Sequence, residues 1–151
     1  MRHFIIDGNN LIGKTSVLQK LQKKDKQSSR ERLAYMLESY FINNKNNKIS
    51  LHLDGFQNAA IKVQNIKIIY SGKKTADDQI KIQIENEKNR RNIVVVTSDH
   101  NLREFAKVCG CEWRSSEDFS KEILSRSVVD DEAKRIDEIN SSDEFKKLFN
   151  V

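Results

Sequence analysis

The sequence is informative first for what it lacks. Its 151 residues include no proline, five glycines and two cysteines. Lys, Asn and Ile are abundant, so we interpret the missing proline as a bias of genome composition rather than of function. The cysteines, Cys109 and Cys111, flank one glycine, and they provide neither a disulfide framework nor the four ligands of a structural zinc site. We expect both to be small buried side chains.

Long apolar runs are also absent. No run approaches the roughly 20 residues needed to cross a bilayer, and the N-terminus leads directly into a predicted strand without a signal-peptide pattern. No Gly-x-Gly-x-x-Gly follows a predicted strand, which argues against a Rossmann-type cofactor site. We therefore expect a cytoplasmic protein with one main domain, no membrane contact and no small-molecule cofactor.

The net charge of +5 is unevenly distributed. Residues 1–114 carry 21 Lys and Arg against 12 Asp and Glu, whereas residues 115–151 carry 6 against 10. The two parts therefore have net charges of +9 and −4. A basic body favours a polyanionic partner, most often a nucleic acid.

Strands and helices are predicted to alternate along the chain. Buried or alternating apolar residues predict strands at 4–6, 48–54, 64–70, 93–96 and 111–113. Helical spacing predicts helices at 29–43, behind a capping box of Ser28 and Glu31, at 75–89, at 102–109 and from 115 onward; residues 14–26 fit a short helix or a loop. This order predicts a three-layer α/β/α fold with a mainly parallel sheet of about five strands. A charged tail, 127–151, follows, with a short amphipathic stretch at Phe145, Leu148 and Phe149.

Three predicted strands end at or near an acid: Asp7, Asp54 and Asp99. Gly8 follows the first of them and is expected to allow a tight turn. Parallel strands share one carboxyl edge, where open α/β sheets bind their ligands, so neighbouring strands would bring these acids into one cleft. Asp77 and Asp78 begin a predicted helix. Each acid has a structural alternative, such as a helix cap or a turn.

Carboxylates gathered in one cleft repel one another, and a bound Mg²⁺ or Mn²⁺ removes that cost. His3, His52 and His100 are isolated, so the ligand set that zinc prefers is missing. An acidic cluster within a basic body fits hydrolysis of phosphodiester bonds, in which metal ions activate water and lysines hold the phosphate backbone.

Several short motifs resemble the NYN domain, and most closely its YacP-like branch within the PIN-like nucleases. They are Asp7-Gly8-Asn9-Asn10-Leu11-Ile12, Leu53-Asp54-Gly55, Thr75-Ala76-Asp77-Asp78, Val96-Thr97-Ser98-Asp99 and Ser115-Ser116-Glu117-Asp118-Phe119. The resemblance covers about residues 3–126 and leaves the acidic tail outside. Asn9 stands where this branch usually has tyrosine, and Asp78 where glutamate is common.

The resemblance implies a PIN-like fold and a Mg²⁺- or Mn²⁺-dependent endoribonuclease acting on single-stranded RNA. The implied catalytic residues are Asp7, Asp77 and Asp99, and the expected metal-binding set is Asp7, Asp54, Asp77, Asp78 and Asp99. Some relatives act on messenger RNA at the ribosome, which makes the ribosome a further expected partner. We predict RNA contacts from Asn9, Asn10, Lys14, Lys73, Lys74, His100 and Arg103.

Two other functions fit parts of the sequence. One is an RNA- or ribosome-binding module that keeps the nuclease fold with little turnover. The other is a phosphorylated receiver domain, with Asp54 as acceptor, but that fold needs paired acids after its first strand, and here Gly8 follows Asp7.

Overall fold

The computed structural model describes residues 1–126. The strands are β1 (His3–Asp7), β2 (Lys48–Leu53), β3 (Ile66–Tyr70), β4 (Ile93–Val96) and β5 (Glu112–Arg114). The helices are α1 (Gly8–Gly13), α2 (Ser16–Lys24), α3 (Lys26–Phe41), α4 (Ala76–Asn86) and α5 (His100–Val108), with a 3₁₀ turn, η1 (Arg90–Asn92), before β4. A further helix covers residues 116–126.

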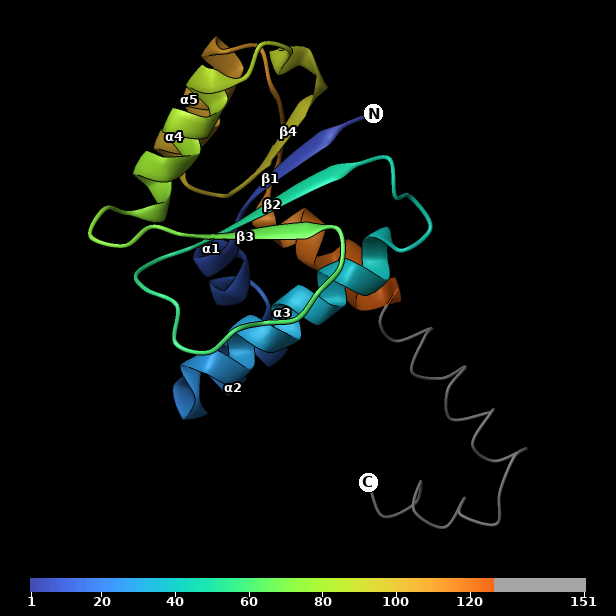
Figure 1. Cartoon of the computed structure of the whole chain (residues 1–151), viewed down its shortest axis with the longest axis vertical. Helices are drawn as coiled ribbons and strands as arrows, with labels where there is room; N and C mark the ends of the chain where they lie inside the picture. Colours follow the sequence, from blue (N-terminus) through green and yellow to red (C-terminus); the bar gives the residue numbers. More distant parts are fainter. Residues whose placement is uncertain (127–151) are drawn as a thin grey trace.

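All five strands are parallel and lie in the order β3-β2-β1-β4-β5. Helices α1, α2, α3 and the 116–126 helix cover one face, and α4 and α5 cover the other (Figure 1). The predicted three-layer α/β/α fold is therefore confirmed. Because β1 lies between β2 and β4, the strands that end near Asp7, Asp54 and Asp99 are neighbours.

Aromatic packing holds the larger of the two core layers together. The Phe4 ring of β1 lies 4.8 Å from Phe41 of α3, and Phe119 of the 116–126 helix lies 5.4 Å from Tyr40. Each such ring buries a large apolar area and adds about 0.5–1.5 kcal/mol per well-placed pair. These contacts hold the 116–126 helix against α3.

Helix α3 begins earlier than its sequence pattern predicted. Its N-cap is Asp25, whose carboxylate accepts the N–H of Gln27, so the helix starts at Lys26 and not after Ser28. The Ser28 hydroxyl donates to Asp25 and serves the same cap one turn into the helix. The ambiguous segment before it is helical and forms α2. In α4 the predicted cap is correct, because the Thr75 hydroxyl accepts the N–H of Asp78.

Gly8 is required for close packing and not for a turn. It is the first residue of α1, and it is not among the residues with a left-handed backbone. A Cβ atom at Gly8 would lie 2.6 Å from the carbonyl oxygen of His52 in β2. The missing side chain therefore lets the start of α1 lie against β2, immediately beside Asp7.

Within residues 1–126, none of the helices combines the length and apolar character that a membrane crossing requires. The predicted amphipathic stretch at Phe145, Leu148 and Phe149 lies outside the described residues.

Candidate active site

Four carboxylates line one open cleft at the carboxyl ends of the strands. They are Asp7 at the end of β1, Asp54 after β2, Asp77 in the first turn of α4 and Asp99 before α5. The cleft has a volume of about 550 Å³ and is also lined by polar side chains, including Asn9, Asn10 and Lys74. The strand order thus brings together acids that are up to 92 positions apart in the sequence.

Asp7 is the most deeply placed of the four and is only 8% exposed. Burial is the main reason that its pKa is raised to about 6; the nearby charges of Asp54 and Asp77 act in the same direction, and the hydrogen bond from the Thr97 hydroxyl acts in the opposite direction. That hydroxyl lies 3.0 Å from Asp7 Oδ2. The ionised form of Asp7 is therefore held at a cost that a neighbouring cation would reduce.

Asp54 and Asp99 each use one oxygen to hold the backbone. Asp54 Oδ1 accepts the N–H of Ala76 at 2.7 Å, which ties the end of β2 to the start of α4. Asp99 Oδ2 accepts the N–H of Leu102 at 3.0 Å and caps α5. Among residues 1–126, the other oxygen of each carboxylate has no hydrogen-bond or ion-pair partner, so it is available to a ligand in the cleft.

Asp77 and Asp78 differ in spite of their adjacent positions. Asp77 lines the cleft and forms an ion pair with Lys81, at 3.3 Å, one turn along α4. Asp78 is exposed and is not a lining residue of the cleft. Asp78 lies near the N-terminus of α4, where its negative charge interacts favourably with the helix dipole. This placement gives no support to its predicted role as a metal ligand.

The cleft offers the oxygen ligands that Mg²⁺ and Mn²⁺ prefer. In the described residues, however, no group of three or more Asp, Glu, His or Cys side chains is arranged so that it could hold a metal directly. Mg²⁺ usually keeps several waters and is bound through one or two carboxylates. The residues therefore fit a largely hydrated divalent ion and do not form a complete cage of protein ligands.

The residues predicted to contact RNA are only partly brought together. Asn9, Asn10 and Lys74 line the cleft, whereas the predicted contacts that lie outside its lining are Lys14, Lys73, His100 and Arg103. The Arg103 guanidinium stacks 4.3 Å from the centre of the Trp113 ring. Lys14 lies near Glu117 and helps to lower the pKa of that carboxyl, for which the hydrogen bond from Ser98 is the largest cause.

Asn9 and Asn10 have a clear structural role. Asn9 Oδ1 accepts the N–H of Asp54 at 2.8 Å. Asn10 Oδ1 accepts both the N–H of Ser98 at 2.9 Å and the hydroxyl of Ser116 at 2.7 Å. The two amides thereby connect the ends of β1, β2 and β4 to the 116–126 helix. Their contact with RNA stays a prediction.

Sequence reasoning missed the residues that position these acids. The Thr97 hydroxyl donates to Asp7 and accepts the N–H of Asp99 at 3.1 Å, while the Trp113 indole donates to the Thr97 carbonyl at 2.7 Å. Arg30 of α3 donates to the carbonyl of Asp54. Thr97 could have been found from its place between a buried strand and Asp99; nothing in the local sequence marks Arg30.

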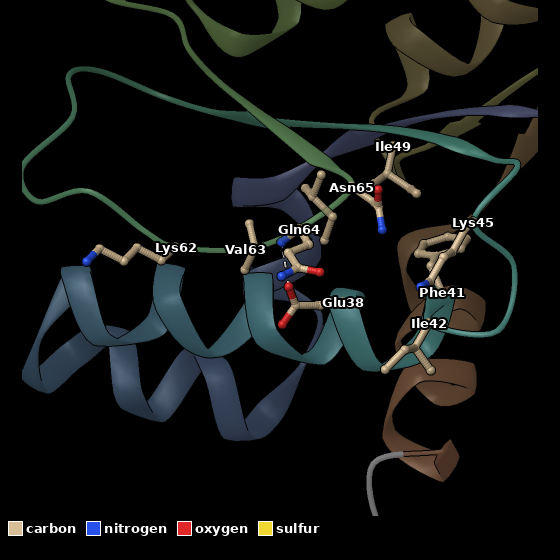
Figure 2. A pocket seen from close by; sticks show the side chains of 10 residues that line it. Glu38, Phe41, Ile42, Lys45, Ile49, Lys62, Val63, Gln64 and Asn65 are labelled. Atoms are coloured by element: carbon tan, nitrogen blue, oxygen red, sulfur yellow. Dashed lines mark hydrogen bonds between the residues drawn. The ribbon is translucent and has the colours of Figure 1, made fainter.

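Other clefts have a different character. One of about 640 Å³ lies between the end of α3 and the chain that enters β3, with Phe41, Ile49 and Val63 among its lining residues (Figure 2). In Figure 2, Glu38 points toward Gln64, and its carboxylate accepts the Gln64 backbone N–H at 2.5 Å. Glu38 is the one acid in this lining, so the acidic cluster is specific to the carboxyl edge of the sheet.

The sequence model of the YacP-like NYN domain matches residues 4–149. The chain belongs to this family. The match continues into the acidic tail, which we had expected to lie outside it, and the predicted domain end at residue 126 stays a prediction. Members of the NYN family are typically nucleases, and the fold described above is of the nuclease type.

Two solved structures share this fold. They are Rae1 (YacP) from Bacillus subtilis and its W164L mutant, with TM-scores of 0.72 for both. Sequence identities are 20% and 21%; the alignments cover 99% and 97% of this chain, and 93% and 89% of those chains. A search of curated proteins found no match. At these identities the two structures support the fold alone.

Proposed function

We propose that this chain is a metal-dependent ribonuclease that hydrolyses phosphodiester bonds of single-stranded RNA at the carboxyl edge of its sheet. The observation that carries the proposal is the cleft in which Asp7, Asp54, Asp77 and Asp99 meet within a basic body. Membership of a family of typical nucleases supports it. A divalent ion, Mg²⁺ or Mn²⁺, would supply activation of water and stabilisation of the leaving oxygen.

The residues of this chain would divide the work as follows. Asp7, Asp77 and Asp99 would hold a largely hydrated divalent ion, in part through its bound waters, and orient the attacking water, and Asp54 would complete the acidic wall of the cleft. Thr97 would keep Asp7 and the backbone of Asp99 in a fixed relation through its single hydroxyl. Lys74, which lines the same cleft, would hold a phosphate of the strand.

The resemblance to the YacP-like branch also makes messenger RNA at the ribosome a candidate substrate. Internal cleavage, as opposed to removal of terminal nucleotides, is proposed on the same ground. The cytoplasmic location stays a prediction.

The proposal is tested by incubating the full chain with end-labelled single-stranded RNA in Mg²⁺, in Mn²⁺ or in EDTA. We expect cleavage with either ion and none in EDTA. Asp99→Asn should cleave at least about 100-fold more slowly, because stabilisation by a bound ion is worth several kcal/mol and each 1.4 kcal/mol is a factor of ten. The amide can still cap α5, so the fold should be kept.

Asp78→Asn is the matched control, because it makes the same chemical change at an exposed acid outside the cleft. It should cleave near the wild-type rate. The Asp99→Asn protein, purified in parallel, also controls for contaminating nucleases. Equal cleavage by Asp99→Asn and wild type, or cleavage that persists in EDTA, would contradict the proposal. Tight RNA binding without any metal-dependent cleavage would instead favour the binding-module function.

A further inference from the structure

An exposed aromatic ring lies in the loop that follows β2, outside the lining of the acidic cleft but close to Asp54 in the chain. Phe56 is 67% exposed, although phenylalanine is among the residues most often buried. It lies two residues beyond Asp54, which is at most about 7 Å of chain. Single exposed apolar residues are common on protein surfaces, so exposure alone assigns no role.

A buried arginine fixes the backbone on both sides of Gly55 and so positions Phe56. Arg30, only 3% exposed, donates to the carbonyls of both Asp54 and Phe56, the latter at 3.2 Å. Its guanidinium also lies 5.6 Å from the centre of the Tyr70 ring. Among residues 1–126 this buried cation has no acidic ion-pair partner, so its charge is used to fix the loop.

Further hydrogen bonds attach the same loop to the turn after β3. The N–H of Gly55 donates to the Ser71 hydroxyl at 2.9 Å, and the carbonyl of Gly55 accepts the N–H of Gly72 at 2.7 Å. Gly55 has φ +79°, which glycine adopts without strain. The loop is therefore fixed on both sides, which lowers the entropy lost when a ligand binds to its side chain.

The ring itself lies over a basic turn. Its Cε1 atom is 3.7 Å from the position that a Cβ atom on Gly72 would occupy, and Lys73 and Lys74 follow Gly72. An exposed aromatic ring beside lysines is the arrangement that binds single-stranded nucleic acids, since bases stack on the ring and cations hold the phosphates.

We propose that Phe56 is a stacking platform for one unpaired base of the RNA strand that enters the acidic cleft. This inference rests on the proposed function and adds a requirement to it: the nucleotide that reaches Phe56 must be unstacked from its neighbours. A base stacked on Phe56 belongs to a strand whose backbone passes Lys74 and Asp54. Base-paired RNA cannot present such a base, so Phe56 selects single-stranded substrate.

The test uses a set of single-stranded RNA oligonucleotides, each lacking one base at a different position. Their affinities are measured with the full chain in Ca²⁺ in place of Mg²⁺. We expect wild type to lose about 5- to 150-fold in affinity when the stacked base is missing, because base stacking on an aromatic ring is worth about 1–3 kcal/mol. Phe56→Ala should bind the intact strand more weakly by a similar factor and should no longer respond to the missing base.

Two further variants sharpen the result. Phe56→Trp should keep the dependence on that base. Tyr35→Ala, which removes another exposed aromatic residue, on α3 and outside the cleft lining, should bind like wild type. If Phe56→Ala loses as much affinity as wild type when the base is missing, the stacking role is overturned. It is also overturned if Phe56→Ala weakens the binding of single- and double-stranded RNA equally. If the wild-type protein binds no RNA, both this inference and the proposed function are overturned. If wild type and Asp99→Asn cleave RNA at the same rate, only the proposed function is overturned.

Discussion

Burial has opposite effects on the pKa values in two groups of polar side chains at the sheet. One is the carboxylate cluster of Asp7, Asp54, Asp77 and Asp99 at the carboxyl edge. The other, which we call the histidine cluster, consists of His3, Ser50, His52 and Gln83 and lies between β1, β2 and α4.

Most polar atoms of the histidine cluster have hydrogen-bond partners within it, and His3 Nδ1 also lies 3.3 Å from Glu87 Oε1. His52 Nε2 donates to Gln83 Oε1 at 2.6 Å, Gln83 Nε2 donates to the Ser50 hydroxyl at 2.9 Å, and that hydroxyl is hydrogen-bonded to His3 Nε2 at 2.8 Å. Burial lowers the pKa of both histidines, so they are accommodated as neutral rings. His52 Nδ1 is the one atom of the cluster that is buried without a partner in the described residues.

The carboxylate cluster cannot satisfy itself in this way, because its members are all acceptors when ionised and carry the same charge. Burial therefore raises the pKa of Asp7 to about 6 where it lowers those of the histidines. A buried polar group with hydrogen-bond partners inside the protein needs no ligand, whereas a bound cation would lower the cost of placing several acids around one open cleft. This difference is the physical reason to place function at one cluster and structure at the other.

The largest expected effect on stability comes from Asp7→Asn in the metal-free protein. The folded pKa of Asp7, about 6, lies above its ordinary value of 3.8. Its contribution to stability is therefore fully present below about pH 4 and is lost as the pH rises through 6. A rise of this size corresponds to about 3 kcal/mol, as an upper limit, so the variant should be more stable than wild type by up to that amount at pH 8.

Urea unfolding in EDTA between pH 4 and pH 8 measures this change. Asp78→Asn serves as the control and should keep the wild-type pH dependence. If Asp7→Asn unfolds at the wild-type urea concentration throughout this range, ionisation of Asp7 does not destabilise the folded protein.

The next effect is on the histidine cluster. Gln83→Leu removes the partner of the His52 Nε2 proton and one partner of the Ser50 hydroxyl. We expect a loss of about 1–3 kcal/mol in the free energy of unfolding, because a buried donor is left unsatisfied. RNA cleavage should be unchanged in the remaining folded protein. Loss of metal-dependent cleavage without loss of stability would contradict the separation of the two clusters.

The two clusters also change the free energy of unfolding in opposite directions as the pH falls. Because the folded pKa values of His3 and His52 lie below 6.5, their contribution is present above pH 6.5 and is lost as the pH falls. In wild type this loss is offset by Asp7. The Asp7→Asn variant should therefore reveal a steady fall in stability from pH 7 to pH 5.

The placement of Asp7, Asp54 and Asp99 could be predicted on the condition that the strands before them are neighbours. Buried apolar runs identified β1 and β4, and parallel strands that share one carboxyl edge bring Asp7, Asp54 and Asp99 together. Asp77 could be placed because the cap at Thr75 fixes the start of α4. These inferences needed local patterns and one rule of topology.

The residues that orient the acids could not be predicted, because their partners are distant in the sequence. Asn10 and Ser116 are 106 positions apart, and Arg30 reaches a loop 24 positions away. The role of Gly8 depends on how closely α1 approaches β2, which no single segment encodes. Such contacts form only when the fold brings the two residues together, so a local sequence pattern cannot predict them.

The smallest expected effect concerns the basic side of the carboxylate cluster, where the structure separates two adjacent lysines. Lys74 lines the cleft, whereas the neighbouring Lys73 is exposed outside it. If RNA passes through the cleft, Lys74→Ala should flatten the dependence of log affinity on log salt by about 0.7, the value for one phosphate contact of a single strand. The loss of affinity should be nearly equal for all RNA sequences, because phosphate contacts position the strand without reading bases.

Lys73→Ala is the matched control and should change the slope less. The measurement is a titration of single-stranded RNA at several salt concentrations with Ca²⁺ in place of Mg²⁺. An unchanged slope in Lys74→Ala, together with a flatter slope in Lys20→Ala on α2, would move the RNA path away from the acids and onto the α2–α3 surface.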